Sequence, residues 1–306
     1  MTREKAIFCW SGGKDSALAL HKVLQSGQYD VLTLVTTLNG NFRRISMHGV
    51  REELLDRQVT AIGLPLHKVV VLGTSNEEYK ANMEAMLLKY KALGAEKVIF
   101  GDIFLEDLRA WRDKNLAAVG MTGVYPLWKM DTRKLANEFI GLGFKSAICC
   151  VNEAYLGKEI VGRDIDREFV DHLPPDVDPC GENGEFHSFV YEGPIFKESL
   201  RIVRGEKVFR PMPAPAATKD SNSYNCEPAR KSLGFWFCDL VAEEDRKPSP
   251  REKVCPKCGV TFLCGANVAG EKCWCSTVPL MPPPIEKDCF CPQCLKDEVA
   301  KRTAPR

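Results

Sequence analysis

The stretch AIFCWSGGKDS, residues 6–16, decides the fold of this chain. Residues 5–10 are apolar and rich in β-forming side chains, which predicts a buried strand, and apolar residues recur at helical spacing between Asp15 and Leu24. The turn Ser11–Gly13 therefore joins a strand to a helix. In such a turn the backbone N–H groups and the amides of the first helical turn point outward together, where the helix dipole adds about half a positive charge. The sequence therefore predicts a phosphate-binding loop.

This loop differs from two common nucleotide-binding motifs. A Walker P-loop ending at Lys14 would need glycine at Phe8 and serine or threonine at Asp15, and the dinucleotide fingerprint would need a third glycine near Ala17. The string SGGKDS, residues 11–16, instead resembles the PP-loop of the N-type ATP pyrophosphatases. That resemblance implies that the β and γ phosphates of ATP are held as a pyrophosphate leaving group while a nucleophile attacks the α phosphate.

The side chains of the loop suit this role. Gly12 and Gly13 lack the Cβ that would hold phosphate away from the backbone, and Lys14 supplies positive charge. Asp15 would repel phosphate unless a magnesium ion lay between them or its carboxylate capped the helix. The predicted ATP-binding residues are Ser11, Gly12, Gly13, Lys14, Asp15 and Ser16.

Composition narrows the class of protein. A chain of 306 residues with 44% hydrophobic residues can bury a substantial core and is expected to form two or three units. Its net charge of +1 gives no general attraction to nucleic acid or to anionic membranes. No apolar run approaches the roughly 20 residues of a membrane span, and the polar start MTREK does not resemble a signal peptide. We therefore predict a cytoplasmic protein without membrane or nucleic-acid partners.

Strand and helix patterns alternate through the first half of the chain. Strand patterns occupy residues 30–38, 67–72, 97–100, 123–127 and 146–151, with helical patterns between them. The alternation predicts right-handed βαβ crossovers and an α/β, Rossmann-like fold of the adenine nucleotide alpha hydrolase type, with helices on both faces of a parallel sheet. The predicted organisation is an ATP-binding domain (1–155), an α+β substrate subdomain (156–209), a linker (210–232) and a cysteine-rich, zinc-binding region (233–306).

Polar residues follow the predicted strands, and in open parallel sheets the loops at the carboxyl ends of strands face the ligand crevice. His48 lies in the loop after the second strand and is a predicted substrate contact. Asp102 directly follows a buried strand and is a predicted catalytic residue. Glu106 and Arg109 share a face of the next helix and are predicted to bind substrate, although helix capping and an ion pair would also account for them.

The segment DPCGENGEFHSF, residues 178–189, crowds titratable groups around two glycines. Ordering such a loop costs conformational entropy, so a functional role is favoured over a simple connector. The predicted catalytic residues here are Glu182, Glu185 and His187, each a candidate to accept a proton from incoming ammonium or amine, and Cys180 is a predicted substrate contact.

Four motifs together, SGGKDS, GDIFLEDLR, GVYPLW and CGENGEF, resemble the diphthine-ammonia ligase family over about residues 5–200, in a form similar to a bacterial branch. The resemblance implies that ATP adenylates a carboxylate, pyrophosphate departs, and ammonia displaces AMP to leave an amide. It implies ATP and magnesium as cofactors, with ammonia and a protein-borne or small-molecule carboxylate as partners, and it allows a homodimer. Lys14 and the loop amides can hold the pyrophosphate while charge builds on it.

Eight of the fourteen cysteines lie between residues 255 and 294. In a reducing compartment such density favours metal over disulfides, and a CxxC turn directs two thiolates at one tetrahedral zinc ion. The segment resembles small cysteine-rich modules with a CWC signature, whose folding energy comes from metal. The eight thiolates could fill two zinc sites, but their spacing leaves the pairing open. The predicted ligands are Cys255, Cys258, Cys264, Cys273, Cys275, Cys289, Cys291 and Cys294.

Two other functions are compatible with a PP-loop. A tRNA-thiolating enzyme would need a CxxC pair within the catalytic domain and would favour a basic balance, but no such pair precedes Cys255. A non-catalytic nucleotide sensor, with a zinc module that binds a partner, would release neither AMP nor pyrophosphate. The products formed from ATP therefore separate a ligase from a sensor.

Overall fold

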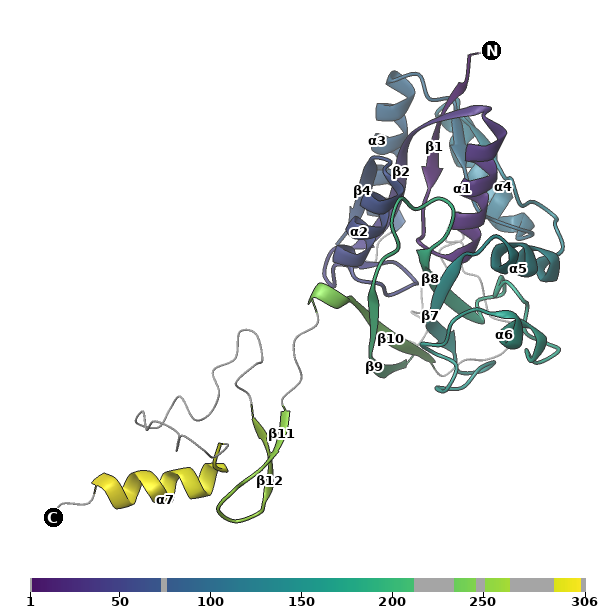
Figure 1. Cartoon of the computed structure of the whole chain (residues 1–306). Coiled ribbons are helices and arrows are strands. Elements are labelled where there is room, and N and C mark those ends of the chain that lie inside the picture. Colours follow the sequence, from purple (N-terminus) through teal and green to yellow (C-terminus); the bar gives the residue numbers. More distant parts are fainter. Residues whose placement is uncertain (1, 73–75, 212–233, 246–250, 265–288, 304–306) are drawn as a thin grey trace. The chain divides into compact units, whose positions relative to one another are not determined.

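The computed structural model describes residues 2–72, 76–211, 234–245, 251–264 and 289–303. The chain divides into two compact units, residues 1–244 and residues 245–306 (Figure 1). The first unit contains two β-sheets and the helices packed against them, whereas the described residues of the second unit form a hairpin and a helix.

The first sheet is organised around β1, the strand that precedes the predicted phosphate loop. β1 lies between β2 and β5 and pairs in parallel with both. β2 also pairs in parallel with β4, β5 pairs in parallel with β6, and the short β3 pairs antiparallel with the end of β2. The carboxyl ends of the central strands therefore meet at one edge, beside the loop. The strands are β1 (Glu4–Cys9), β2 (Tyr29–Asn39), β3 (Arg44–Ile45), β4 (Leu66–Val71), β5 (Lys97–Ile99) and β6 (Thr122–Val124).

Helices cover both faces of this sheet. Alternate side chains of β1 point to opposite faces, so Phe8 joins a core with α1, α2 and α5, whereas Ile7 joins a core with α3 and α4. The predicted Rossmann-like α/β fold is confirmed by this arrangement. The helices are α1 (Lys14–Ser26), α2 (Glu52–Ile62), α3 (Asn76–Ala92), α4 (Glu106–Ala118) and α5 (Thr132–Gly141).

The second sheet is antiparallel, with strand order β8-β7-β10-β9. Residues 146–151 were predicted to extend the parallel sheet, but they form β7, which pairs antiparallel with β8 and β10. That prediction was wrong because β7 is buried on both faces, the pattern that a central parallel strand also has. β10 also belongs to this sheet, although its residues fall within the region, residues 233–306, that was predicted to be cysteine-rich. The elements are β7 (Lys145–Asn152), α6 (Arg167–Asp171), β8 (Phe186–Glu192), β9 (Ile202–Pro211) and β10 (Gly234–Ala242).

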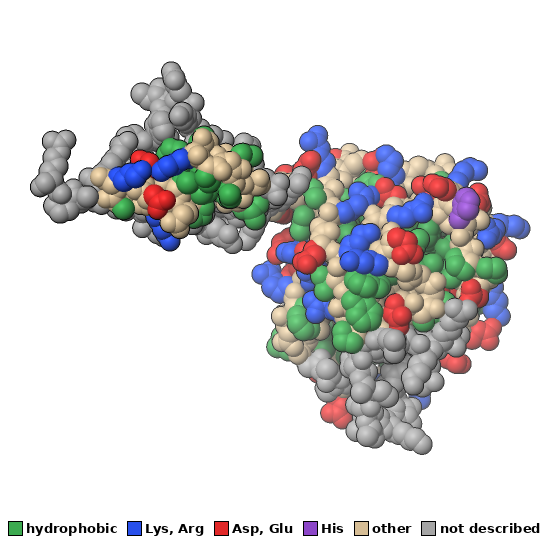
Figure 2. All heavy atoms as spheres, turned by 90° about the horizontal axis from the view of Figure 1, so that it is seen from below, with side chains coloured by type: hydrophobic (Ala, Val, Ile, Leu, Met, Phe, Trp, Pro, Cys, Tyr) green, Lys and Arg blue, Asp and Glu red, His purple; other side chains and the backbone are tan. Residues whose placement is uncertain are grey.

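The remaining elements are few. A 3-10 turn, η1 (Glu243–Asp245), lies at the boundary between the units, and the second unit contains β11 (Arg251–Val254), β12 (Thr261–Cys264) and α7 (Pro292–Thr303). Of the predicted linker, residues 210 and 211 end β9, and residues 212–232 lie outside the described residues. None of the helices in the described ranges combines the length and the apolar character that crossing a bilayer requires. On the face of the first unit drawn in Figure 2, basic and acidic side chains are interspersed.

Candidate active site

The loop at residues 11–16 follows β1 and runs into the first turn of α1, as predicted. Gly12 has a φ of +80°, and a Cβ there would come within 2.9 Å of the Gln58 side chain. A Cβ on Gly13 would come within 2.9 Å of the His48 ring. Gly13 is the N-cap of α1 and has no side chain to cap the first-turn amides. The loop therefore leaves backbone donors beside a helix N-terminus, where an anion is stabilised.

Gln58 of α2 and Ser188 of β8 hold the loop from outside. The Gln58 amide nitrogen donates to Gly12 O at 3.0 Å and to Val190 O at 2.6 Å, while its Oε1 accepts from Trp10 Nε1 at 2.8 Å. Ser188 Oγ accepts a hydrogen bond from the Lys14 amide at 3.2 Å. Sequence reasoning did not select either residue, because both are distant from the loop in the chain.

Replacing Gln58 with leucine is expected to lower the free energy of unfolding by about 2–4 kcal/mol, because three buried hydrogen bonds are lost together and the Trp10 indole N–H loses its acceptor. Urea titration measures this loss. The control is Gln25→Leu at an exposed position of α1, which should stay within about 0.5 kcal/mol of the unmodified protein. Equal stability of the two variants would contradict the role assigned to Gln58.

Lys14 is buried beneath the loop and keeps its positive charge. Its Nζ donates to Asp15 Oδ2 at 2.7 Å and to the carbonyl oxygen of Cys180, and it lies 5.3 Å from the centre of the Phe186 ring. Burial opposes the charge, but the adjacent Asp15 carboxylate raises the pKa of Lys14 above its usual value. An ammonium group has three donors, so a third remains for a phosphate oxygen.

Three carboxylates, from Asp15, Asp102 and Glu182, line a cavity of about 510 Å³ together with the phosphate loop. We call this the loop cavity. Asp102 Oδ2 lies 2.9 Å from Arg112 Nε, and Glu182 Oε2 accepts from the Ile103 amide at 3.3 Å. Burial raises the pKa of Asp102, and burial together with the charge of Asp15 raises the pKa of Glu182 to about 8. Both groups therefore lie where a bound cation would stabilise their charged forms.

Glu185 has contacts that differ from those of Glu182. Its fully buried carboxylate accepts from the amides of Asp178 and Asn183, each at 2.9 Å, and from the Asn183 side chain at 3.1 Å. It is absent from the described lining of the loop cavity. Cys180 does line the cavity, and its Sγ–H donates to Thr132 O at 3.3 Å, while burial raises the pKa of its thiol. The contacts of Glu185 thus shape the loop that carries Glu182.

His48 and His187 stack against each other in the wall of the loop cavity, with ring centres 4.7 Å apart and planes inclined by 31°. His48 Nδ1 lies 3.1 Å from Ser188 O, and since a carbonyl only accepts, Nδ1 carries the proton. Burial lowers the pKa of His48 to about 4. Burial, and then the neighbouring His48 and Lys14, lower the pKa of His187 well below its usual value. Both rings are therefore neutral near pH 7.

Acidification should destabilise the first unit through this pair. Because the pKa of His48 is lowered from 6.5 to about 4, its contribution to stability is complete above pH 6.5 and is lost as the pH falls toward 4. The loss for His48 amounts to about 3 kcal/mol. Urea titrations at pH 7 and pH 4.5 should show a smaller pH dependence for His48→Gln than for the unmodified protein or for the exposed His172→Gln control. Parallel pH profiles for all three proteins would refute the assignment.

Two of the predicted substrate contacts lie outside the loop cavity. Glu106 is largely exposed and pairs with Lys129 at 2.7 Å. The Arg109 guanidinium stacks on Tyr125 and Trp128, 4.6 Å and 4.5 Å from the ring centres. These contacts connect α4 to the segment after β6, and they differ from the helix capping and the ion pair within the helix that the sequence offered as the alternative. One turn further along α4, Arg112 lines the cavity, but its pairing with Asp102 could not be read from spacing.

Four of the eight predicted metal ligands form one cluster in the second unit. The sulfur atoms of Cys255, Cys258, Cys291 and Cys294 all lie within 4.8 Å of one another, an arrangement that can hold a metal ion. Burial opposes ionisation of Cys255, but backbone hydrogen bonds from residues 291, 257 and 258 lower its pKa to about 6. Among the described residues, Cys264 and Cys289 lie outside this cluster, and Cys273 and Cys275 fall outside the described ranges.

Three protein-family models match successive parts of the chain. The diphthamide synthase N-terminal domain matches residues 4–123, the diphthamide synthase C-terminal domain matches residues 131–213, and the cysteine-rich CWC model matches residues 255–296. The first two cover the phosphate loop, the segment with Asp102 and the CGENGEF loop. The third contains all four clustered cysteines.

Curated relatives are similar at low identity. The diphthine–ammonia ligase of Danio rerio is 25% identical over 233 residues, covering 65% of this chain and 86% of the relative. The enzyme of the same name from Mus musculus is 23% identical over 229 residues, covering 65% and 82%. The Schizosaccharomyces pombe enzyme is 24% identical over 225 residues, and the match spans 67% of this chain but 37% of the yeast protein. A solved structure, described as a predicted subunit of tRNA methyltransferase from Methanocaldococcus jannaschii, is 15% identical with a TM-score of 0.33, covering 64% of this chain and all of that one.

Proposed function

Because this chain belongs to the diphthamide synthase family, whose two domain models match most of residues 4–213, we propose that it is an ATP-dependent ligase that converts a carboxylate into an amide. In the first step a carboxylate oxygen attacks the α phosphorus of ATP, the bond to the β phosphate breaks, and pyrophosphate leaves. In the second step ammonia attacks the acyl carbon of the acyl adenylate, AMP leaves, and one proton is released. The products are the amide, AMP and pyrophosphate.

The observation that carries this proposal is the construction of the phosphate loop. Two glycines bring backbone amides to a helix N-terminus, and a buried, charged lysine lies beneath them. These donors suit the pyrophosphate as negative charge accumulates on it during attack at the α phosphate. Attack at the α phosphate rather than phosphorylation is supported by the resemblance of residues 11–16 to the PP-loop of the N-type ATP pyrophosphatases and by the family match over residues 4–123.

The residues of the loop cavity also fit a magnesium ion bound with ATP. Asp15, Asp102 and Glu182 offer oxygen donors of the type that magnesium prefers, and the pKa values of Asp102 and Glu182 are raised mainly by burial, which a bound cation would offset. Such an ion would neutralise charge on the phosphates. The protein's own part is to orient the nucleotide, and Lys14 would contact the departing pyrophosphate.

We propose that Glu182 accepts the ammonium proton and that His187 orients the incoming ammonia. Both residues line the loop cavity, and His187 is supported by stacking on His48. The burial that keeps the His187 ring neutral also makes it a weak base, so its free nitrogen is suited to accept a hydrogen bond from ammonia. The pKa of Glu182, raised to about 8, lies closer to the operating pH, which suits a group that accepts a proton.

The two glutamates of the CGENGEF loop should respond differently to substitution. Glu185→Gln places an amide N–H against N–H donors and is expected to cost about 2–4 kcal/mol of stability. Glu182→Gln should leave stability nearly unchanged and lower the rate of AMP formation by about tenfold to a hundredfold. Urea titration and AMP release measured on both variants check this. Loss of activity without loss of stability in Glu185→Gln would reverse the two roles.

Product analysis tests the reaction itself. The full chain, ATP, magnesium and ammonium are incubated with a panel of carboxylic acids, and the nucleotides are separated by chromatography. Acid-dependent AMP and pyrophosphate support the proposal. Formation of ADP and orthophosphate, or no nucleotide turnover with bound ATP, would overturn it, and the second result would favour a nucleotide sensor.

We also propose that the four-cysteine cluster binds zinc. Four thiol ligands from two CxxC pairs suit tetrahedral coordination, and the low pKa of Cys255 provides a thiolate near neutral pH. A second site formed from the other four cysteines of this segment stays a prediction.

A further inference from the structure

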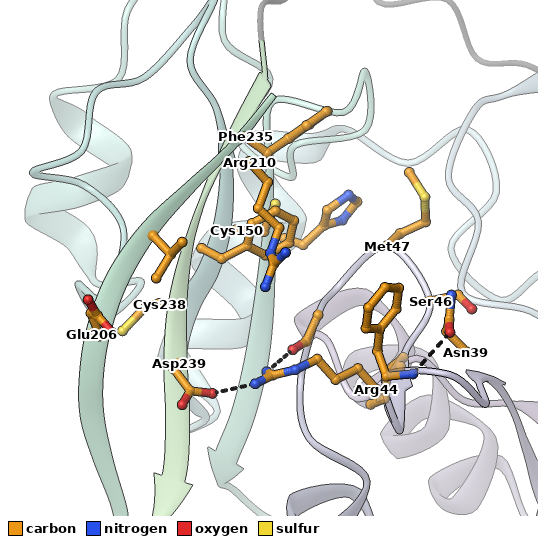
Figure 3. Close-up of a pocket in the computed structure, with 16 residues that line it drawn as sticks. Asn39, Arg44, Ser46, Met47, Cys150, Glu206, Arg210, Phe235, Cys238 and Asp239 are labelled. Carbon is orange, nitrogen blue, oxygen red and sulfur yellow. Dashed lines mark hydrogen bonds and ion pairs between the residues drawn. The ribbon is translucent and has the colours of Figure 1, made fainter. Parts of the chain in front are cut away.

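A second cavity, of about 370 Å³, adjoins the loop cavity in the first unit (Figure 3). It lies between the segment around β3 and one face of the antiparallel sheet, and we call it the sheet cavity. None of residues 11–16 is among its described lining. The lining residues that the two cavities share are Ile45, Ser46, Met47, His187 and Phe235. A molecule in the sheet cavity therefore meets the loop cavity at the ring of His187.

The wall on the sheet side is mainly apolar and comes from alternate residues of two paired strands. Val208 and Arg210 of β9 and Phe235 and Phe237 of β10 all face the cavity, as the period of two along a strand requires. The opposite wall contributes Phe42. Such a lining suits a molecule with a flat or branched apolar body.

The two arginines of the sheet cavity differ in what they already bind. The Arg44 guanidinium already has partners within the protein, because it donates to Asp239 at 2.9 Å and to Gly49 O at 2.6 Å. Figure 3 shows the Arg210 guanidinium directed into the cavity, and among the described residues no hydrogen bond or ion pair engages it. Glu206, on the same strand, forms no ion pair with it. Arg210 is therefore the cation of this cavity that is available to an anionic ligand.

We propose that the sheet cavity binds the acceptor of the ligase reaction, and that this acceptor is an amphiphilic acid with two anionic groups on an apolar body. This inference rests on the proposed function, from which it takes that the reacting group is a carboxylate. Arg210 does not line the loop cavity, so the anion that it holds is not the carboxylate that meets ATP. A second carboxylate at the shared wall, beside His187, would be the one that is adenylated.

The test is binding of a matched pair of probes to the full chain saturated with α,β-methylene-ATP, which cannot release pyrophosphate. Isothermal titration calorimetry compares 2-phenylsuccinate, which has two carboxylates, with 3-phenylpropionate, which has one. We expect the dicarboxylate to bind about tenfold more tightly, and Arg210→Gln to remove that difference. The control is Arg201→Gln, at an exposed arginine paired with Glu243 at 3.8 Å, which should keep the tenfold difference in affinity between the two probes.

A second pair of variants tests the cavity without altering charge. Val208→Trp fills the sheet cavity and should weaken 2-phenylsuccinate at least tenfold, while Phe209→Trp, on the other face of the same strand, should not. ATP-analogue affinity should be unchanged in both. No measurable binding to the unmodified protein at millimolar concentrations, or equal binding by all variants, would overturn the proposal. Turnover is measured separately with ATP, magnesium and ammonium. Binding of 2-phenylsuccinate without AMP formation in that assay would refute adenylation alone, whereas AMP formation from 2-phenylsuccinate that Val208→Trp leaves unchanged would refute the cavity alone.

Discussion

Replacing Lys14 with methionine is expected to reduce acid-dependent AMP formation by about a hundredfold to a thousandfold. Lys14 is the buried cation beneath the phosphate loop, and its charge is maintained by Asp15 at 2.7 Å. If it stabilises the departing pyrophosphate, its removal acts on the transition state, where a single preorganised donor contributes about this much. Methionine keeps the length and the apolar contact with Phe186, so the change isolates the charge.

The control for Lys14 lies on the same helix. Lys22 is partly exposed and pairs with Glu138 of α5, away from the loop cavity, so Lys22→Met should retain full activity. Initial rates of AMP formation at saturating ATP, together with circular dichroism spectra of each variant, separate loss of chemistry from loss of fold. A folded Lys14→Met protein that keeps more than about a tenth of the rate would remove Lys14 from the reaction.

Removal of metal should unfold the second unit while the first unit stays folded. The described part of this unit has a small core formed by Cys255, Cys291 and Cys294 with Phe262 and Phe290, which offers little apolar burial. Binding of structural zinc contributes about 10–16 kcal/mol in small zinc domains, so a metal in the cluster would dominate the stability of the unit. A chelator should therefore abolish the dispersed NMR signals of residues 251–264 and 289–303 and expose these residues to protease.

Substitution gives the same test without a chelator. Cys291→Ser should lower the bound zinc by about one ion per chain, because Cys291 belongs to the four-thiol cluster. It should also unfold the second unit, as the chelator does. Cys9→Ser, at the end of β1, should leave the zinc content unchanged. Atomic absorption measures the zinc. A second unit that keeps its spectrum after complete loss of metal would show that the cluster is not what stabilises it.

Much of the fold could be predicted because its signals are local. The buried strand β1, the glycine turn and the apolar spacing of α1 are contiguous in the chain, so the strand, turn and helix were predicted at the positions where the structure has them. The alternation of strands and helices also placed Asp102 at the carboxyl edge of the sheet, and the crowding of titratable groups around two glycines selected the loop that carries Glu182. The paired cysteines at Cys255 and Cys291 carried their own spacing signal. Each of these features depends on residues close together in sequence.

The features that the sequence did not reveal depend on contacts that form only in the folded chain. β7 was assigned to the wrong sheet because its partners, β8 and β10, come later in the chain and burial on both faces does not reveal strand direction. Glu182 and Glu185 could not be told apart, because only the folded loop directs Asn183 and Asp178 at one of them.

The sequence by itself determined that a glycine turn joins a buried strand to a helix, which predicts phosphate binding, and that a cysteine-rich segment follows. Tertiary structure alone decided that Gln58 supports the loop, that His48 stacks on His187, and that a second cavity with Arg210 opens beside the first. The reason is physical. Periodicity and turn chemistry act over a few residues, whereas a cavity is made by side chains that only long-range strand pairing and core packing bring together.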